Sequence, residues 1–238
     1  MTPGDIVGLI LSYVYAFGLL FIVEAIGRRF KWRQSFTRKI IHIGAGLWIW
    51  GILALFDHWY FGIIPFATFI VLNYVFYRQQ SFKAMDTEAS TPGTVYFAVS
   101  ITLLFAGLWR TGGAVDRVPI AAAGVMAMTL GDAFASIVGE RWGRHKYAWG
   151  GGSRSWEGSV AMIAVTLPSV FTTLWLLLGS ALSPNSTPMG PVGIIVTSLM
   201  GTAVATIAEM LSPAGTDNLS VPLLSGAAML LVSLAFGG

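Results

Sequence analysis

The sequence predicts an all-α fold, a polytopic bundle of transmembrane helices, from three observations. Of its 238 residues, 55% are hydrophobic and only 11% are charged, whereas soluble domains carry about 25% charged residues. Several apolar runs approach the roughly 20 residues that a helix needs to cross a bilayer. The runs are continuously apolar rather than alternating, which favours helices over the strands of a membrane barrel.

Eight spans account for these runs: 6–26, 40–56, 60–77, 94–109, 118–138, 159–178, 191–208 and 220–236. The fourth and eighth are short, so seven spans with one half-inserted segment is an alternative. The first run carries Asp5 and has no basic residue ahead of it, which is typical of an anchor rather than a cleaved signal. Little sequence is left for loops, which predicts a single domain over residues 1–238. The absence of cysteine excludes disulfides and thiol catalysis.

The positive residues predict the orientation. Only Arg110 and Arg117 lie in loops that follow even-numbered spans. The other twelve of the 14 Lys and Arg residues follow the first, third and fifth spans: Arg28, Arg29, Lys31, Arg33, Arg38, Lys39, Arg78, Lys83, Arg141, Arg144, Lys146 and Arg154. The positive-inside bias therefore predicts that these loops are cytoplasmic and that both termini are outside.

Asp132 is the most informative single residue, because ionisable groups at membrane depth usually face a cavity, a partner or an ion. The alternative is an interfacial carboxylate that reaches water from a helix-packing seam. Small residues around it would form such a seam: Gly124, Ala127, Gly131, Ala135 and Gly139. The outer loops offer Asp57, His58 and Asp116, for which we expect no comparable clustering.

Two basic elements on the predicted inner side suit phosphate. The loop 142–158, WGRHKYAWGGGSRSWEG, mixes glycines, cations, a hydroxyl and a carboxylate; glycines let backbone N–H groups approach phosphate oxygens, and cations neutralise them. Arg38, Lys39 and His42 begin the second span, where Arg38 and His42 share a helix face. The alternative for both elements is ordinary anchoring at lipid headgroups.

Acidic residues complete the inner side. Glu209, Asp217 and Asn218 lie between the last two spans. Mg²⁺ prefers one or two carboxylates plus substrate phosphates, which makes Asp132, Glu209 and Asp217 its candidate ligands. The alternative makes Asp217 and Asn218 part of a turn. Together these residues predict a phosphate and magnesium site that opens on the inner leaflet.

The tryptophans are expected to serve the membrane rather than a nucleic acid. Trp48, Trp50, Trp59 and Trp109 lie near span ends or on apolar faces. Tryptophan is enriched where a helix meets the headgroups. We therefore interpret these four as interface anchors, and expect the bilayer, not nucleic acid, as a partner.

Residues 132–158 read D-x-x-A-x-x-x-G-x-x-x-G-x-x-K, followed by R-S-x-E-G. This closely resembles the CTP-binding stretch of the polyprenol kinase family, which includes dolichol, phytol and farnesol kinases. Two further elements resemble the family's, R-K-x-x-H at 38–42 and D-N-L-x-V-P-L at 217–223 after Glu209. The first stretch matches at Asp132, Ala135, Gly139, Gly143, Lys146, Ser155, Glu157 and Gly158. The three separated motifs occur in the family's order and together span residues 38–223, which is most of the chain.

The resemblance implies CTP-dependent phosphorylation of a long-chain isoprenoid alcohol (phytol, farnesol, geranylgeraniol or a polyprenol), with Mg²⁺, at the cytoplasmic face of a prokaryotic plasma membrane or a plastid-type membrane. It implies catalytic roles for Asp132 and for Asp217 or His42 as the base. It implies magnesium ligands among Asp132, Glu209, Asp217 and Glu157. The implied nucleotide-binding residues are Arg38, Lys39, Gly139, Gly143, Lys146, Arg154, Ser155, Glu157, Gly158 and Asn218.

One departure and two alternatives accompany the resemblance. Arg154 stands where the family usually has Lys, and the planar fork of Arg is not interchangeable with the point charge of Lys. CTP-dependent phosphatidate cytidylyltransferases carry a similar motif, so formation of a CDP-lipid with release of pyrophosphate is an alternative. A transporter that uses Asp132 and Glu209 as proton or ion relays is an alternative of another class.

Overall fold

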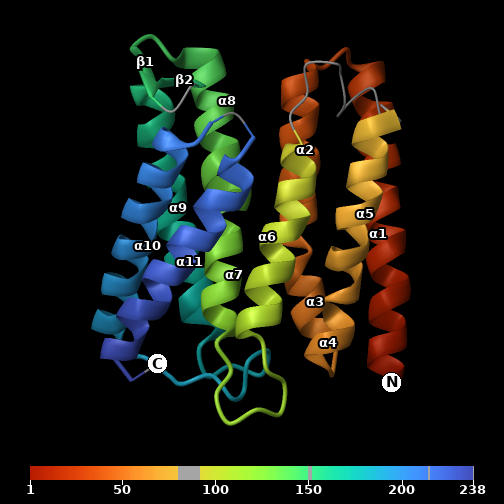
Figure 1. Cartoon of the computed structure of the whole chain (residues 1–238), viewed down its shortest axis with the longest axis vertical. Helices are drawn as coiled ribbons and strands as arrows, with labels where there is room; N and C mark the ends of the chain where they lie inside the picture. The colour runs from red at the N-terminus through yellow and green to blue at the C-terminus, as the bar shows by residue number, and fades with distance from the viewer. Residues whose placement is uncertain (80–91, 150–151, 214, 238) are drawn as a thin grey trace.

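The structure is a computed structural model, and it describes residues 1–79, 92–149, 152–213 and 215–237. Long helices stand side by side in an upright bundle (Figure 1), which confirms the predicted all-α fold. The helices are α1 (Pro3–Arg29), α2 (Gln34–Leu47), α3 (Ile49–Leu55), α4 (Trp59–Gly62), α5 (Ile64–Gln79), α6 (Gly93–Leu108), α7 (Val118–Met126), the π-helix η1 (Ala127–Asp132), α8 (Ala133–Trp142), α9 (Trp156–Leu177), α10 (Pro191–Leu211) and α11 (Asp217–Ala235).

In the part of the chain that the structure describes, the helices give eight passes along the bundle axis, because α2 continues into α3, α4 into α5, and α7 through η1 into α8. In the described ranges, seven of these passes are long and apolar enough to span a membrane. The remaining pass is α6, the fourth along the chain. Its 16 residues extend about 24 Å, less than the roughly 30 Å of the hydrocarbon core. Both termini lie at the same end of the bundle (Figure 1).

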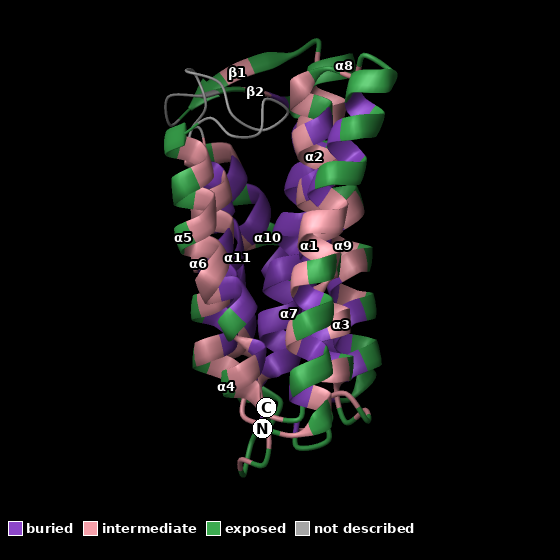
Figure 2. Ribbon diagram, turned by 90° about the vertical axis from the view of Figure 1, so that its right-hand side faces the viewer, coloured by how far each residue is buried: buried purple, intermediate pink, exposed green. Residues whose placement is uncertain are grey.

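The fifth pass, from α7 through η1 to α8, forms the core of the bundle. Most of the stretch from α7 to α8 is buried, and Figure 2 shows α7 in purple between its neighbours. Small residues permit this packing: a Cβ on Gly124 would lie 2.9 Å from the Pro222 carbonyl oxygen, and one on Gly131 would lie 2.1 Å from Thr166 Oγ1. The small-residue seam around Asp132 is therefore where α9 and α11 approach closely.

Residues 142–149 and 152–158 contain two short strands where the sequence predicted a loop. Strands β1 (Lys146–Trp149) and β2 (Gly152–Ser155) pair antiparallel, with Lys146 opposite Ser155 and Tyr147 opposite Arg154. Gly150 and Gly151 lie outside the described residues, as does Lys83. The hairpin places the motif cations next to the end of α8 and the start of α9.

Two expectations for the opposite end were wrong. Asp5 is fully buried, and its carboxylate accepts hydrogen bonds from His58 Nδ1 (2.7 Å) and from the backbone N–H groups of Asp57 and His58. Polar residues therefore do cluster here, because a buried carboxylate needs partners. Trp109 is only 1% exposed and packs on Phe105, so it is a core residue rather than an interface anchor.

Candidate active site

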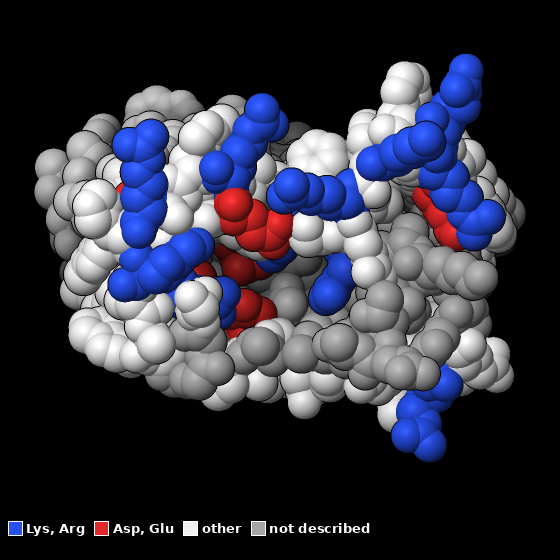
Figure 3. Space-filling view, turned by 90° about the horizontal axis from the view of Figure 1, so that it is seen from above, with Lys and Arg blue, Asp and Glu red and all other residues white. Residues whose placement is uncertain are grey.

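The three motif stretches meet at one end of the bundle, which we call the basic end: the end at which α2, α9 and α11 begin and α8 and α10 finish. Figure 3 looks onto this end and shows Asp and Glu side chains inside a hollow, with Lys and Arg around it. Residues separated by most of the sequence length share this hollow, from Lys39 on α2 to Asp217 on α11.

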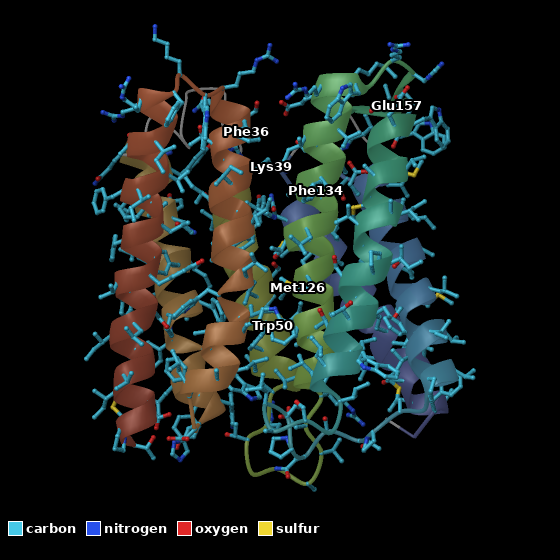
Figure 4. The ribbon with its side chains drawn as sticks, turned by 180° about the vertical axis from the view of Figure 1, so that it is seen from behind. Phe36, Lys39, Trp50, Met126, Phe134 and Glu157 are labelled. Atoms are coloured by element: carbon cyan, nitrogen blue, oxygen red, sulfur yellow. The ribbon has the colours of Figure 1, made fainter. Side chains whose placement is uncertain are left out.

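Asp132 and Lys39 form the centre of the site. Asp132 ends η1, is 1% exposed, and accepts a hydrogen bond from Lys39 Nζ at 2.7 Å. The alternative of a carboxylate that reaches water was therefore wrong. The wide turn of a π-helix alters which way the following residues face, and such turns are frequent at functional sites. Figure 4 shows Lys39 between α2 and α8, well inside the end of the bundle.

Arg154 on β2 connects the acidic residues of the last two helices. Its Nε lies 3.2 Å from Glu209 Oε1, and its Nη2 donates to Asp217 Oδ2 at 3.0 Å. Burial lowers the pKa of the guanidinium, but the carboxylates of Glu209 and Asp217 outweigh it, so the pKa of Arg154 is raised. Arg154 is thus a permanent cation, held between two carboxylates that also interact electrostatically with Asp132.

Several oxygens at this site have the chemistry of magnesium ligands. Glu209 Oε2 and Asn218 Oδ1 are buried and have no hydrogen-bond partner, which is uncommon for buried polar atoms and calls for an explanation. Within the described ranges no three His, Asp or Glu side chains form a preformed metal cluster. Mg²⁺ commonly takes few protein ligands and completes its shell with phosphates and water, so the residues present fit this ion.

Glu157 lies apart from these carboxylates. Its Oε1 accepts from His145 Nδ1 at 2.7 Å, and both of its oxygens approach the His145 backbone N–H. Figure 4 places it near the surface of the basic end, on the far side of α8 from Lys39. Its assignment as a magnesium ligand stays a prediction, and the structure pairs it with a histidine instead.

The motif glycines bring α8 and α9 together around Ser155. A Cβ on Gly143 would lie 2.6 Å from Ser155 Oγ, one on Gly139 3.0 Å, and one on Gly158 3.2 Å. Ser155 caps α9, because its Oγ accepts from the Gly158 N–H at 3.1 Å. Lys146 Nζ donates to the Gly139 carbonyl at 3.0 Å. The structure thus gives these residues a packing role, and their contact with a nucleotide stays a prediction.

His42 is fixed in one tautomer. Its Nε2 lies 3.1 Å from the Met128 carbonyl oxygen, and since a carbonyl can only accept, Nε2 must carry the proton. In neutral imidazole the other nitrogen, Nδ1, then has a free lone pair. The ring also packs against Phe97, with 4.7 Å between centroids.

An apolar pocket opens beside the charged centre. Arg38, Lys39, His42 and Asn218 line it at the basic end, and its walls come from α1, α2, α5 and α6. The wall residues were not singled out in the sequence, apart from Trp48; they include Tyr15, Leu19, Ala45, Phe66, Phe69 and Phe97. Apolar residues that line a pocket have the same composition as those that face lipid, so only the structure identifies them.

The comparisons with known proteins agree with the motifs. A curated phytol kinase from Synechocystis sp. (strain ATCC 27184 / PCC 6803 / Kazusa) is 32% identical over 232 residues, which cover 91% of this chain and 87% of the relative. The chain belongs to the polyprenol kinase family. Other members of the family that resemble it are a probable chloroplastic phytol kinase from Triticum aestivum, 27% identical over 93% of this chain and 74% of the relative, and a chloroplastic farnesol kinase from Arabidopsis thaliana, 30% identical over 64% and 54%.

The other two comparisons found nothing: no family model matches the chain, and no solved structure matches it. The link between this polyprenol kinase family member and the cytidylyltransferases gains no support from these relatives.

Proposed function

We propose that this chain phosphorylates an isoprenoid alcohol, with CTP as the phosphate donor and Mg²⁺ as the cofactor, at the cytoplasmic face of its membrane. One observation supports the proposal most: Lys39, which is paired with the buried Asp132, also lines the mouth of an apolar pocket. A charged centre that opens directly onto an apolar pocket suits a reaction between a phosphate donor and the hydroxyl of a lipid. The names of the relatives, phytol and farnesol kinases, indicate the same reaction class.

Phosphoryl transfer depends mainly on positioning and on neutralising charge. Lys39 and Arg154 supply two cations that already pair with carboxylates of the site. Arg38 lines the neighbouring pocket, and Lys146 is exposed on the hairpin. Arg154 can exchange its carboxylate partners for phosphate oxygens, to which its planar fork can bind in bidentate fashion. Its guanidinium would then neutralise the charge that develops on the transferred group.

Asp132, Glu209 and Asp217 would hold Mg²⁺, with the free oxygen of Asn218 next to them. The ion held there would offset the negative charge of the phosphates during the transfer. The carboxylates lie in the hollow below the cations (Figure 3), so the ion and the phosphates would share one site.

The alcohol oxygen attacks the γ-phosphorus of CTP, the bond from that phosphorus to the β–γ bridging oxygen breaks, and CDP leaves with the electron pair. The hydroxyl proton must go to a base. His42 suits this role, because it lines the pocket and its tautomer leaves Nδ1 as an acceptor. Asp217 suits it less, since Arg154 and Asn218 occupy both of its oxygens.

The test is an assay of the purified protein in detergent with labelled CTP, Mg²⁺ and phytol or geranylgeraniol. The expected products are CDP and the prenyl phosphate. Release of pyrophosphate, with formation of a CDP-lipid from phosphatidate, would contradict the proposal and support the cytidylyltransferase. Transport across reconstituted vesicles without consumption of CTP would contradict it in favour of a transporter. Parallel reactions with ATP, GTP and UTP test the choice of nucleotide.

A further inference from the structure

The apolar pocket extends inward from the basic end, between α1, α2, α5 and α6. Along α2 and the residue that follows it, the lining includes Lys39, His42, Ala45 and Trp48, so Trp48 is the lining residue farthest from the basic end on this stretch. Trp48 lies nine positions after Lys39, which corresponds to about 14 Å along a helix, or roughly half of the hydrocarbon thickness. Ser12 of α1 and Phe66 of α5 line the same inner end.

The distribution of polar groups defines the kind of ligand. Polar groups gather at the mouth, where Lys39, His42 and Asn218 lie, and Asn218 Oδ1 has no hydrogen-bond partner. Two other polar side chains of the lining are already paired: Asn73 Nδ2 donates to the Thr94 carbonyl at the start of α6 at 2.9 Å, and at the inner end Ser12 Oγ donates to the Gly8 carbonyl at 2.7 Å. A ligand with one polar head and a long apolar tail complements this pattern, with the head at Lys39 and the tail directed toward Trp48.

Trp48 is held rigidly at the inner end. Its indole Nε1 donates to Ser12 Oγ at 3.0 Å, and its ring stacks on Tyr15 with 4.2 Å between centroids and 14° between planes. The Tyr15 hydroxyl donates in turn to the Gly44 carbonyl at 2.8 Å. The ring lies over Gly51, where a Cβ would come within 2.9 Å of it.

The position of Trp48 in the backbone adds to this rigidity. It is the residue between α2 and α3, so the break in the helix and the floor of the pocket coincide. Two aromatic rings fixed by hydrogen bonds to two different helices make a floor that a flexible tail cannot easily displace, because rotation of either ring breaks these contacts.

We propose that Trp48, stacked on Tyr15, is the floor of the isoprenoid-tail pocket and determines which chain lengths this chain accepts. This inference rests on the proposed kinase function and specifies its substrate. Tails that end above the indole bind within the pocket, whereas longer tails must bend or leave between the helices. Removal of the indole extends the pocket and favours longer alcohols, and a larger side chain above it favours shorter ones.

The experiment measures kcat/KM in mixed micelles for geraniol, farnesol and geranylgeraniol, with wild type and three variants. Trp48→Ala is expected to raise the ratio of geranylgeraniol to farnesol by about 10-fold or more, the discrimination typical of apolar pockets. Ala45→Leu, which fills the middle of the pocket, is expected to lower the same ratio. Trp50→Ala is the matched control, since Trp50 packs on the core and does not line the pocket.

The outcomes separate the inference from the function on which it rests. If wild type phosphorylates none of the alcohols, the proposed function fails. If wild type is active but Trp48→Ala and Ala45→Leu keep its chain-length ratio, the floor is refuted and the function stands. If Trp48→Ala does not fold, Trp48→Phe and Ala45→Leu carry the test, and an unchanged ratio in both refutes the proposal. An equal shift in Trp50→Ala would also refute it.

Discussion

Replacement of Asp132 by Asn tests both the structure and the chemistry of the site. The side chain keeps its shape but loses its charge, and Lys39 Nζ, 2.7 Å away, loses its anionic partner. Asp132 is 1% exposed and the Lys39 side chain 21%, so the ammonium is left in a largely buried place. Removal of one partner of a buried ion pair typically costs about 3–5 kcal/mol, and the partial exposure of Lys39 puts the expected loss near the lower limit.

The catalytic effect should be larger than the loss of stability explains. One missing electrostatic contact at a reacting centre typically lowers kcat by about 10²–10³-fold. Two measurements are compared in the same detergent: the initial rate of CDP release at saturating phytol and Mg²⁺, and the thermal unfolding temperature. The double variant Lys39→Met, Asp132→Leu removes both charges, so we expect it to regain stability but not activity.

Asp5 provides a matched control, because it is also fully buried and paired, with His58 Nδ1 at 2.7 Å, but lies at the opposite end. Asp5→Asn should lose stability and keep kcat within about threefold of wild type, since distant, independent sites do not couple. The reasoning is refuted if folded Asp132→Asn retains kcat near wild type. It is equally refuted if the double variant regains activity together with stability.

Three further predictions concern neighbouring features. Arg154→Lys keeps the charge but cannot contact Glu209 and Asp217 simultaneously, so we expect kcat to fall by about 10-fold, and by about 10²–10³-fold in Arg154→Gln. Since the pKa of Arg154 is raised, its guanidinium stays protonated throughout the assay range. An Arg154→Lys rate that recovers fully at lower pH would contradict the role of the guanidinium fork. Gly143→Ala should lower the unfolding temperature, because its Cβ would lie 2.3 Å from the Gly139 carbonyl oxygen. In the control Gly18→Ala the Cβ meets nothing within 4 Å, and the free energy of unfolding should rise by up to about 1 kcal/mol. Equal unfolding temperatures of the two variants would contradict the packing role of Gly143. Treatment with EDTA should abolish CDP release, and Mg²⁺ should restore it more effectively than Ca²⁺; turnover that survives EDTA would remove the metal from the proposal.

Local features of the sequence predicted most of the fold. Continuous apolar runs mark helices of spanning length whatever their partners are, because the bilayer requires each span to satisfy its own backbone. The eighth span, for example, is confirmed as α11, although the helix begins at Asp217, three residues before the predicted start. The break at Trp48 and the hairpin after α8 were not predicted, since packing and pairing decide both.

The motifs likewise identified which residues gather at the basic end: Asp132 is an ionisable residue at membrane depth, and Arg154 and Asp217 belong to motif stretches in the loops on the same side. Only the tertiary structure decided their partners: Lys39 for Asp132, and Glu209 with Asp217 for Arg154. Pairs so far apart in sequence depend on how whole helices pack, which no local pattern encodes.

By itself, then, the sequence determined the class of fold, the spans and the three motif stretches that meet at one end of the bundle. The tertiary structure decided which tryptophans do not lie at the membrane interface. In the sequence, Trp109 and Trp48 have the same kind of neighbours as an interface anchor, but Trp109 lies in the core and Trp48 at the pocket floor. It also decided where the apolar pocket lies. The physical reason is the same for both: to a helix in a bilayer, lipid and protein interior are equally apolar, so only the arrangement of the helices distinguishes a wall of the pocket from a surface in lipid.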